Sequence, residues 1–276
     1  MKNIYITDLD HTFLQSDLSV GDYTKKIWNS YSNDSIMSIA TARTYKKTIQ
    51  FLAGIKVNAA MILLDGALVV TKEKKIIDTK FIGKEIADEI INAGSKLGIY
   101  PFIISLADAN LNEVFLHSST LNSYQKKVLT RYTRDDNLIE LSDLEALDKN
   151  FKIVYMGEED LLTALAEKLQ NTYGESLKFI LAPEAYVGCY FLTILHKDAD
   201  KAHGIQSVSE YEGFDLKKLT VFGDNFNDIG MFDLAGTSIA VANAQEGVKE
   251  LADIVLPHTN DEEAVAKYLE GLQYAQ

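Results

Sequence analysis

Two aspartates follow the first apolar run of the chain, and two more follow a similar run far downstream. Asp8 and Asp10 come directly after the first run, whereas Asp224 and Asp228 come after a run that ends at Phe222. Alternate residues of an extended segment point the same way, so Asp8 and Asp10 can face one site. Clustered carboxylates repel one another unless a cation lies among them, and oxygen ligands suit Mg²⁺. The pattern therefore predicts a metal site combined with a carboxylate nucleophile.

Each of these aspartates also has a simpler interpretation. Asp commonly begins turns, and Asn227 and Asp228 are typical of helix capping. If the first pair is catalytic, one carboxylate can attack an electrophile while the other handles a proton. Gly223 permits a tight turn before Asp224, which is placed to bind a cation.

Two further residues could hold an anion. Thr41 follows an apolar run, and a hydroxyl with backbone amides at a strand-to-helix junction can hold a phosphate. Lys201 precedes a helical run and could neutralise both a phosphate and a nucleophilic carboxylate. The alternatives are an N-cap for Thr41 and a surface position for Lys201.

The elements around these residues predict an α/β fold. Apolar strands alternate with helical patterns in the first and last thirds of the chain, as in buried parallel sheets. The expected strands cover residues 3–7, 35–40, 60–64, 219–222, 238–241 and 254–256. The middle third reads as a separate α+β unit. We therefore expect a discontinuous α/β domain at 1–81 and 188–276, interrupted by an inserted α+β domain at 82–187.

Composition narrows the classes of partner. The 276 residues are 47% hydrophobic and 24% charged, with a net charge of −13, which argues against nucleic acid or anionic membrane as the main partner. No apolar run approaches the roughly 20 residues that span a bilayer. The N-terminus lacks a signal-peptide layout, and the single cysteine, Cys189, fits a reducing compartment, so we expect a cytoplasmic protein.

The segments around Asp8, Thr41, Lys201 and Asp224, in this order along the chain, resemble the motifs of the haloacid dehalogenase (HAD) superfamily. Within that superfamily, the chain resembles the Cof-type phosphatases with a large α/β cap. Asp8-Leu9-Asp10-His11-Thr12 is similar to the family motif DxDGT, and Ala40–Arg43 is similar to ATGR. Lys201 matches the third motif, and Gly223–Asp228 matches GDxxND. The resemblance covers essentially the full length, including the position of the insertion.

The resemblance implies a Rossmann-like core with an inserted cap domain, and a Mg²⁺-dependent phosphatase that acts on a small phosphorylated metabolite, such as a sugar phosphate. It implies an aspartyl-phosphate intermediate, with Asp8 as nucleophile and Asp10 as acid and base. The implied metal ligands are Asp8, the Asp10 main-chain carbonyl, Asp224 and Asp228, the last directly or through water. The implied phosphate-binding residues are Thr41, Lys201 and Asn227.

Two departures and several alternatives stay open. His11 stands where the motif has Gly; it could adopt a positive φ, which His tolerates better than most residues, or its ring could contact substrate. Arg43 is a second candidate for substrate contact, and the inserted segment offers His117, Tyr186 and Tyr190 by residue type alone. The other departure is Asp65, where relatives often have Asn.

The alternatives to a phosphatase are a phosphomutase on the same scaffold and a non-catalytic protein that binds phosphometabolites. We expect a monomer or a weak homodimer.

Overall fold

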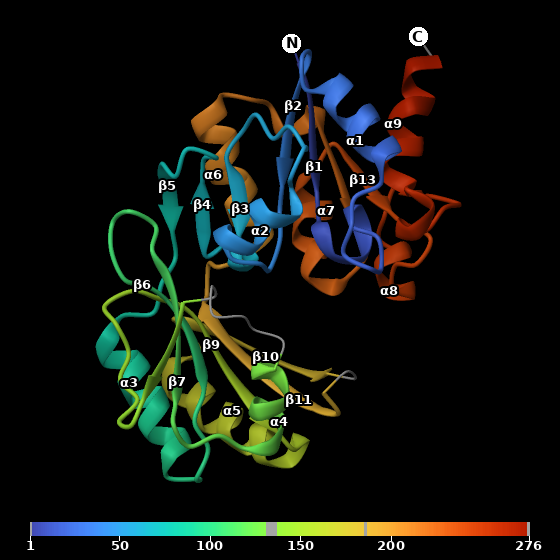
Figure 1. The fold of residues 1–276 in the computed structure, drawn as a ribbon. Helices are drawn as coiled ribbons and strands as arrows, with labels where there is room; N and C mark the ends of the chain where they lie inside the picture. Colours follow the sequence, from blue (N-terminus) through green and yellow to red (C-terminus); the bar gives the residue numbers. More distant parts are fainter. Residues whose placement is uncertain (1, 131–136, 185–186, 275–276) are drawn as a thin grey trace. The chain divides into compact units, whose positions relative to one another are not determined.

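The chain divides into two compact units in a computed structural model that describes residues 2–130, 137–184 and 187–274. The first unit combines Met1–Thr79 with Asp200–Gln276, and the second is the intervening segment Lys80–Ala199. Figure 1 shows the first unit in blue to teal and in orange to red, and the second in green to gold.

A parallel five-stranded sheet forms the centre of the first unit, in the order β14-β13-β12-β1-β2. Its strands are β1 (Asn3–Thr7), β2 (Ser35–Ile39), β12 (Leu219–Gly223), β13 (Thr237–Ala240) and β14 (Ile254–Val255). The predicted strands are confirmed to within one residue at either end. Ile4, Ile6 and Val221 on the central strands expose 1% of their surface or less, as expected for parallel strands covered on both faces.

Helices enclose this sheet. They are α1 (Asp22–Tyr31), α2 (Tyr45–Phe51), α6 (Lys201–Glu212), α7 (Ile229–Leu234), α8 (Glu246–Lys249) and α9 (Ala264–Tyr274). The helices α1 and α9 lie side by side (Figure 1). Tyr5 and Phe222 of the sheet pack edge-on against Tyr31 of α1 and Tyr268 of α9, respectively. These aromatic contacts fix one helical layer on the sheet.

A small antiparallel sheet extends the first unit beyond β2. It consists of β3 (Met61–Leu63), β4 (Leu68–Val70) and β5 (Ile76–Thr79). A parallel bridge between Ala40 and Ile62 links it to the main sheet. The helix α6 packs against all three of its strands.

The second unit is an α+β fold, as predicted. Its six-stranded sheet has the order β10-β11-β9-β6-β7-β8. The strands are β6 (Phe102–Leu106), β7 (Glu113–Ser118), β8 (Leu138–Leu141), β9 (Asn150–Gly157), β10 (Leu177–Glu184) and β11 (Cys189–His196). The helices are α3 (Lys84–Ser95), α4 (Ser123–Leu129) and α5 (Glu159–Tyr173). Leu162, Leu165 and Leu169 repeat at helical spacing along α5 and are buried in the core of this unit.

One predicted boundary is wrong. The sequence places the return to the first domain at residue 188, whereas the second unit continues to Ala199. The strand β11 lies in the second unit because it pairs with β9 and β10. The corresponding start of the insertion is Lys80, close to the expected 82.

Among the described helices, none combines the length and the apolar character that crossing a membrane requires.

Candidate active site

Three adjacent strands end at one edge of the parallel sheet, and each is followed by a predicted site residue. β1 and β12 run in register, with Thr7 opposite Phe222, and the Asp8 amide donates to the Phe222 carbonyl at 2.9 Å. β2 pairs with the other side of β1 in the same parallel sense. Asp8, Thr41 and Asp224 therefore follow neighbouring strands, at the edge where open α/β sheets bind ligands.

A buried cluster of four charged side chains lies at this edge. Carboxylate oxygens of Asp8, Asp224 and Asp228 lie within 4.8 Å of one another. Lys201, the first residue of α6, donates from Nζ to Asp8 Oδ1 at 2.5 Å and to Asp228 Oδ1 at 2.6 Å. None of the four residues is more than 6% exposed. Lys201 is thus not a surface lysine, and the two carboxylates hold its ammonium between them.

The carboxylates outnumber the cation, and their pKa values reflect this. Burial raises the pKa of Asp8 well above its usual range; Lys201 lowers it, but Asp228 and Asp224 raise it further. Burial and the neighbouring Asp228 raise the pKa of Asp224 to about 6, although a hydrogen bond from Thr12 lowers it. Burial disfavours the charged form of Lys201, but Asp228 and Asp8 more than offset this and raise its pKa. The lysine is therefore charged, whereas ionisation of Asp8 and Asp224 is disfavoured without a further cation.

The donor set of this cluster fits a divalent metal ion. Three carboxylates with one ammonium leave two negative charges uncompensated, which equals the charge of Mg²⁺. Asp8 Oδ2 and Asp224 Oδ2 receive no hydrogen bond from the described part of the chain, and the opposite oxygens bind Lys201 and Thr12. Oxygen donors of this kind suit Mg²⁺. Asp8 and Asp224 could therefore hold the ion.

Asp228 has a different environment from the other two carboxylates. Its Oδ2 accepts hydrogen bonds from the amides of Asp224 and Asn225, at 2.9 and 3.0 Å, while its Oδ1 binds Lys201. A Cβ at Gly223 would lie only 2.6 Å from Asp228 Cγ, so this carboxylate requires glycine there. Asp228 is thus placed to hold the loop and Lys201 in position.

Asp10 lies in the turn after β1, and no sequence pattern predicted its partner. Both oxygens of its carboxylate are bound by Arg43, at 2.7 Å from Nε and 2.5 Å from Nη2. The Arg43 guanidinium in turn stacks over the Phe51 ring at 4.2 Å. Arg43 was predicted as a substrate contact; in the structure it orients the carboxylate predicted to carry the proton.

His11 adopts the conformation that the motif glycine would permit. Its φ is 58° and its ψ is 7°, in the left-handed region that His tolerates better than most residues. Its carbonyl accepts a hydrogen bond from Asn243 at 2.8 Å, and the next residue, Thr12, donates to Asp224 Oδ1 at 2.9 Å. The turn thereby connects the loop after β1 to Asp224. Adaptation of the backbone is confirmed; a substrate contact by the ring stays a prediction.

Thr41 and Asn227, the two other residues predicted to bind phosphate, differ in burial and in their partners. Thr41 is fully buried beside the site and its Oγ1 accepts from the Arg43 amide at 3.2 Å. It is not the N-cap of α2, because Thr44 has that role. Asn227 is exposed and donates to Asp65 Oδ1 at 3.1 Å. Thr41 is therefore at the strand edge, whereas Asn227 links the GDxxND loop to the turn at Asp65.

The candidates in the second unit are explained by packing where they are described. His117 is 5% exposed, packs edge-on against Phe102, and its Nδ1 lies 2.9 Å from the Ser118 carbonyl. Tyr190 packs against the core formed with α3 and α5. Tyr186 lies outside the described residues.

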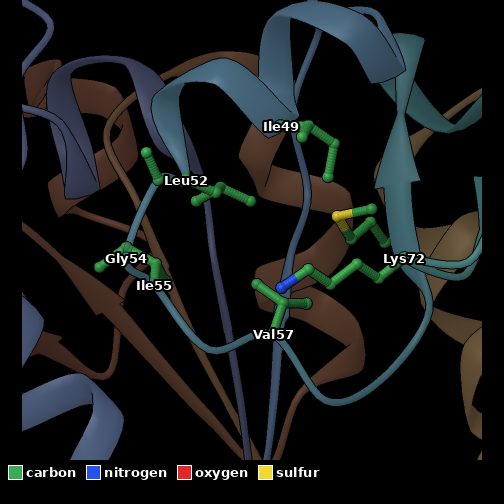
Figure 2. Close-up of a pocket in the computed structure, with 8 residues that line it drawn as sticks. Ile49, Leu52, Gly54, Ile55, Val57 and Lys72 are labelled. Carbon is green, nitrogen blue, oxygen red and sulfur yellow. The ribbon is translucent and has the colours of Figure 1, made fainter.

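A separate pocket of about 180 Å³ lies at the end of α2 and in the loop before β3. Figure 2 shows the side chains of Ile49, Leu52 and Val57 around it, with Lys72 extending towards Val57. No predicted site residue contributes to its lining. The candidate active site is therefore the cluster of Asp8, Asp224, Asp228 and Lys201, and not this pocket.

The sequence matches the family model of the haloacid dehalogenase-like hydrolases over residues 5–269. Because the match covers nearly the whole chain, the protein belongs to this family of hydrolases. The predicted family is confirmed.

Curated relatives over nearly the full length are phosphatases. A 5-amino-6-(5-phospho-D-ribitylamino)uracil phosphatase of Bacillus subtilis is 20% identical over 95% of this chain and 94% of its own length. An HMP-PP phosphatase of Cronobacter sakazakii is 24% identical over 98% of this chain and 95% of its own length.

Solved structures share the whole fold. The Thermotoga maritima protein TM0651 superposes with a TM-score of 0.82 at 26% identity, covering 98% of this chain and 97% of its own. A haloacid dehalogenase-like hydrolase of Bacteroides thetaiotaomicron gives 0.83 at 19% identity, covering 99% and 100%. The latter comparison bears on the fold alone.

Proposed function

We propose that this hydrolase is a Mg²⁺-dependent phosphatase that hydrolyses a small phosphorylated metabolite through an aspartyl-phosphate on Asp8. The observation that carries the proposal is the buried contact of Lys201 with Asp8 and Asp228, at 2.5 and 2.6 Å. A nucleophilic carboxylate and a phosphate-binding cation are adjacent there. The phosphatase relatives support the same reaction class.

Phosphoryl transfer would proceed in two steps. Asp8 attacks phosphorus, the ester P–O bond breaks, and Asp10 gives a proton to the leaving oxygen. Asp10 then removes a proton from water, which attacks the phosphoryl group, so that orthophosphate leaves and the Asp8 carboxylate is restored. Lys201 and the Thr41 hydroxyl bind the phosphoryl oxygens.

Mg²⁺ held by Asp8 and Asp224 would supply positive charge that keeps Asp8 ionised and lets it approach an anionic phosphate. The side chains of the site supply the other interactions. Lys201 stays charged between its two carboxylates, and Asp228 holds Lys201 and the Asp224 amide in place.

The pair of Asp10 with Arg43 sets a condition on the proton steps. The Arg43 guanidinium binds both carboxylate oxygens of Asp10, so the oxygen that exchanges a proton must be released from this contact. To act as the acid, Asp10 must first take up a proton, and its contact with Arg43 must loosen. Arg43 is therefore a positioning residue for Asp10 in this proposal.

The names of the relatives support the substrate class that we propose. Their names describe organic phosphates of small molecules, which include a phosphorylated ribityl chain. We propose a sugar phosphate or a similar phosphorylated polyol. A cytoplasmic location and a monomer or weak homodimer remain predictions.

The test is a hydrolysis screen over sugar phosphates, nucleotides, cofactor phosphates and p-nitrophenyl phosphate, with Mg²⁺ and with excess chelator. We expect orthophosphate release that requires Mg²⁺ and is lost in Asp8→Asn. The matched control is Asp22→Asn, which alters a fully exposed side chain of α1.

Near wild-type turnover in Asp8→Asn would contradict the mechanism. Transfer of the phosphoryl group within the substrate, without release of orthophosphate, would identify the protein as a phosphomutase instead. Binding of phosphorylated ligands without either reaction would identify a non-catalytic binding protein.

A further inference from the structure

A second polar cluster lies in the first unit where the chain leaves it and returns. The chain leaves after Thr79, at the end of β5, and returns at Asp200, just before α6. Asp78 on β5 accepts two hydrogen bonds on the same oxygen, from His203 Nε2 at 2.9 Å and from Ser207 Oγ at 2.9 Å. Because this partner is a carboxylate, Nε2 of His203 carries the proton.

Both donors come from the first two turns of α6, four residues apart, and therefore lie on one face of the helix. His203 and Asp78 are about a quarter to a third exposed, at 30% and 24%. Their contact thus ties the beginning of α6 to the last residues of β5, next to both points where the chain crosses between units.

The same end of α6 is fixed by close backbone contacts. The Asp200 side chain caps the helix by accepting from the His203 amide at 2.7 Å. A Cβ at Gly66 would lie 1.9 Å from the Asp200 carbonyl oxygen, and one at Gly204 would lie 2.4 Å from Ile62 Cγ2. Only glycine permits these approaches, so the helix is seated tightly on the Gly66 turn and on β3.

The position of this helix end matters because Lys201 is its first residue. The Lys201 ammonium meets two carboxylates at hydrogen-bonding distance, and a small shift of the helix would lengthen both contacts. Misplacement of a binding group by about 1 Å can reduce the rate about a hundredfold.

We propose that Asp78, His203 and Ser207 are positioning residues that hold the start of α6 so that Lys201 meets the phosphoryl group. This inference rests on the proposed function, which assigns Lys201 to phosphate. The three side chains act through Lys201 and do not contact the substrate. Removing them weakens phosphate binding and turnover while leaving the nucleophile in place.

The experiment compares three substitutions at one position. His203→Ala removes the donor, whereas His203→Gln places an amide N–H near the position of Nε2. We expect kcat/KM for p-nitrophenyl phosphate to fall about tenfold in His203→Ala and to recover to within about twofold in His203→Gln. His203→Asn, whose amide is too short to reach Asp78, should behave like His203→Ala.

Orthophosphate binding, measured by calorimetry on the full chain with Mg²⁺, should weaken in parallel with kcat/KM. The matched control is Ser209→Ala, which removes the hydrogen bond from Ser209 to the Phe214 carbonyl at the opposite end of α6. It perturbs the same helix away from Lys201, so we expect a lower melting temperature with unchanged phosphate affinity.

A double-substitution cycle with Asp78→Ala completes the test. The double variant should lose no more activity than Asp78→Ala alone, because Asp78→Ala already removes the contact with His203. If His203→Ala folds poorly, Ser207→Ala provides a milder form of the test, with a smaller change in the same direction.

Wild-type kcat/KM and phosphate affinity in His203→Ala would overturn the inference, as would equal losses in Ser209→Ala or failure of His203→Gln to recover. Failure of the proposed function has a different signature. In that case the wild-type protein itself releases no orthophosphate from any ester.

Discussion

Two buried polar sites of this protein, one in each unit, differ in how their charges are balanced. In the second unit Asn150 is fully buried, and its amide donates to the carbonyls of Ile82 and Leu147 while its oxygen accepts from Ser105. All of these hydrogen-bond partners of Asn150 belong to the second unit, and the cluster carries no charge. At the strand edge of the first unit, three buried carboxylates lie together, and one lysine contacts two of them, Asp8 and Asp228.

The difference is between a neutral side chain whose hydrogen bonds are complete within the fold and carboxylates whose charge an added cation could compensate. A neutral, fully hydrogen-bonded side chain such as Asn150 needs nothing further. The cluster around Asp8 is stable only if protons or an added cation compensate its charge. We therefore propose that the edge of the first sheet is the functional one, and four substitutions or conditions can test that contrast.

The largest effect is expected for Lys201→Met. Removing the only ammonium from three buried carboxylates should lower kcat/KM by about 10³-fold and the free energy of unfolding by about 3–5 kcal/mol. Phosphatase kinetics and chemical denaturation measure the two losses. Lys197→Met, at a half-exposed side chain, is the matched control and should change neither. Retained activity in Lys201→Met would remove this lysine from the site.

Metal binding and pH should act together on stability. The pKa of Asp224 in the folded chain is about 6, above its ordinary value of 3.8. As the pH rises between these values, the unfolded chain releases its proton while the folded carboxyl keeps it. The metal-free protein should therefore lose on the order of 3 kcal/mol of stability, and the loss should be complete above about pH 6.

Mg²⁺ should reverse this loss, because it binds the ionised carboxylates. Thermal unfolding with and without Mg²⁺ should show a larger stabilisation near pH 7.5 than near pH 4.5. An equal shift at both pH values would contradict the assignment of the metal to Asp8 and Asp224.

A smaller effect on function is expected in the second unit. Asn150→Ala should lower the stability of that unit by about 2–3 kcal/mol, because several buried partners lose their hydrogen bonds. Orthophosphate affinity should stay within about twofold, since the phosphate-binding residues lie in the other unit. Asn110→Ala, in an exposed loop, is the control and should leave both unchanged. Loss of phosphate affinity in Asn150→Ala would show that the contrast between the units is too simple.

The smallest effect is expected for His11→Gly. Relief of a left-handed backbone conformation should raise the free energy of unfolding by about 1 kcal/mol. Lys74→Gly, at an exposed residue with φ 68°, should give a similar gain without any change in activity. If His11→Gly also changes KM, the imidazole contacts the substrate; an unchanged KM would leave it a purely conformational residue.

The strand edge could be predicted from sequence because local signals determine it. Apolar runs locate the strands, parallel pairing aligns their ends, and the residues that follow must then meet. This logic brought Asp8, Thr41 and Asp224 together correctly. It could not place Lys201, which follows no strand of the parallel sheet; only the family resemblance singled out this lysine.

Other features had no local signal. The pairing of Arg43 with Asp10 joins two loops, where no periodicity constrains side chains. The strand Cys189–His196 reads as a buried strand whichever sheet it joins, so its sequence could not show that it pairs within the second unit. The cluster of Asp78 with His203 likewise depends on how α6 is seated on β5.

The central claim is that Asp8 accepts the phosphoryl group, and its most direct test is acid-quenched mass spectrometry during turnover. With a rapidly hydrolysed ester and Mg²⁺, a phosphoryl group should be found on the peptide that contains Asp8. It should be absent from Asp8→Asn and from protein incubated without substrate. A fully active enzyme with no such adduct, together with turnover by Asp8→Asn, would contradict the claim.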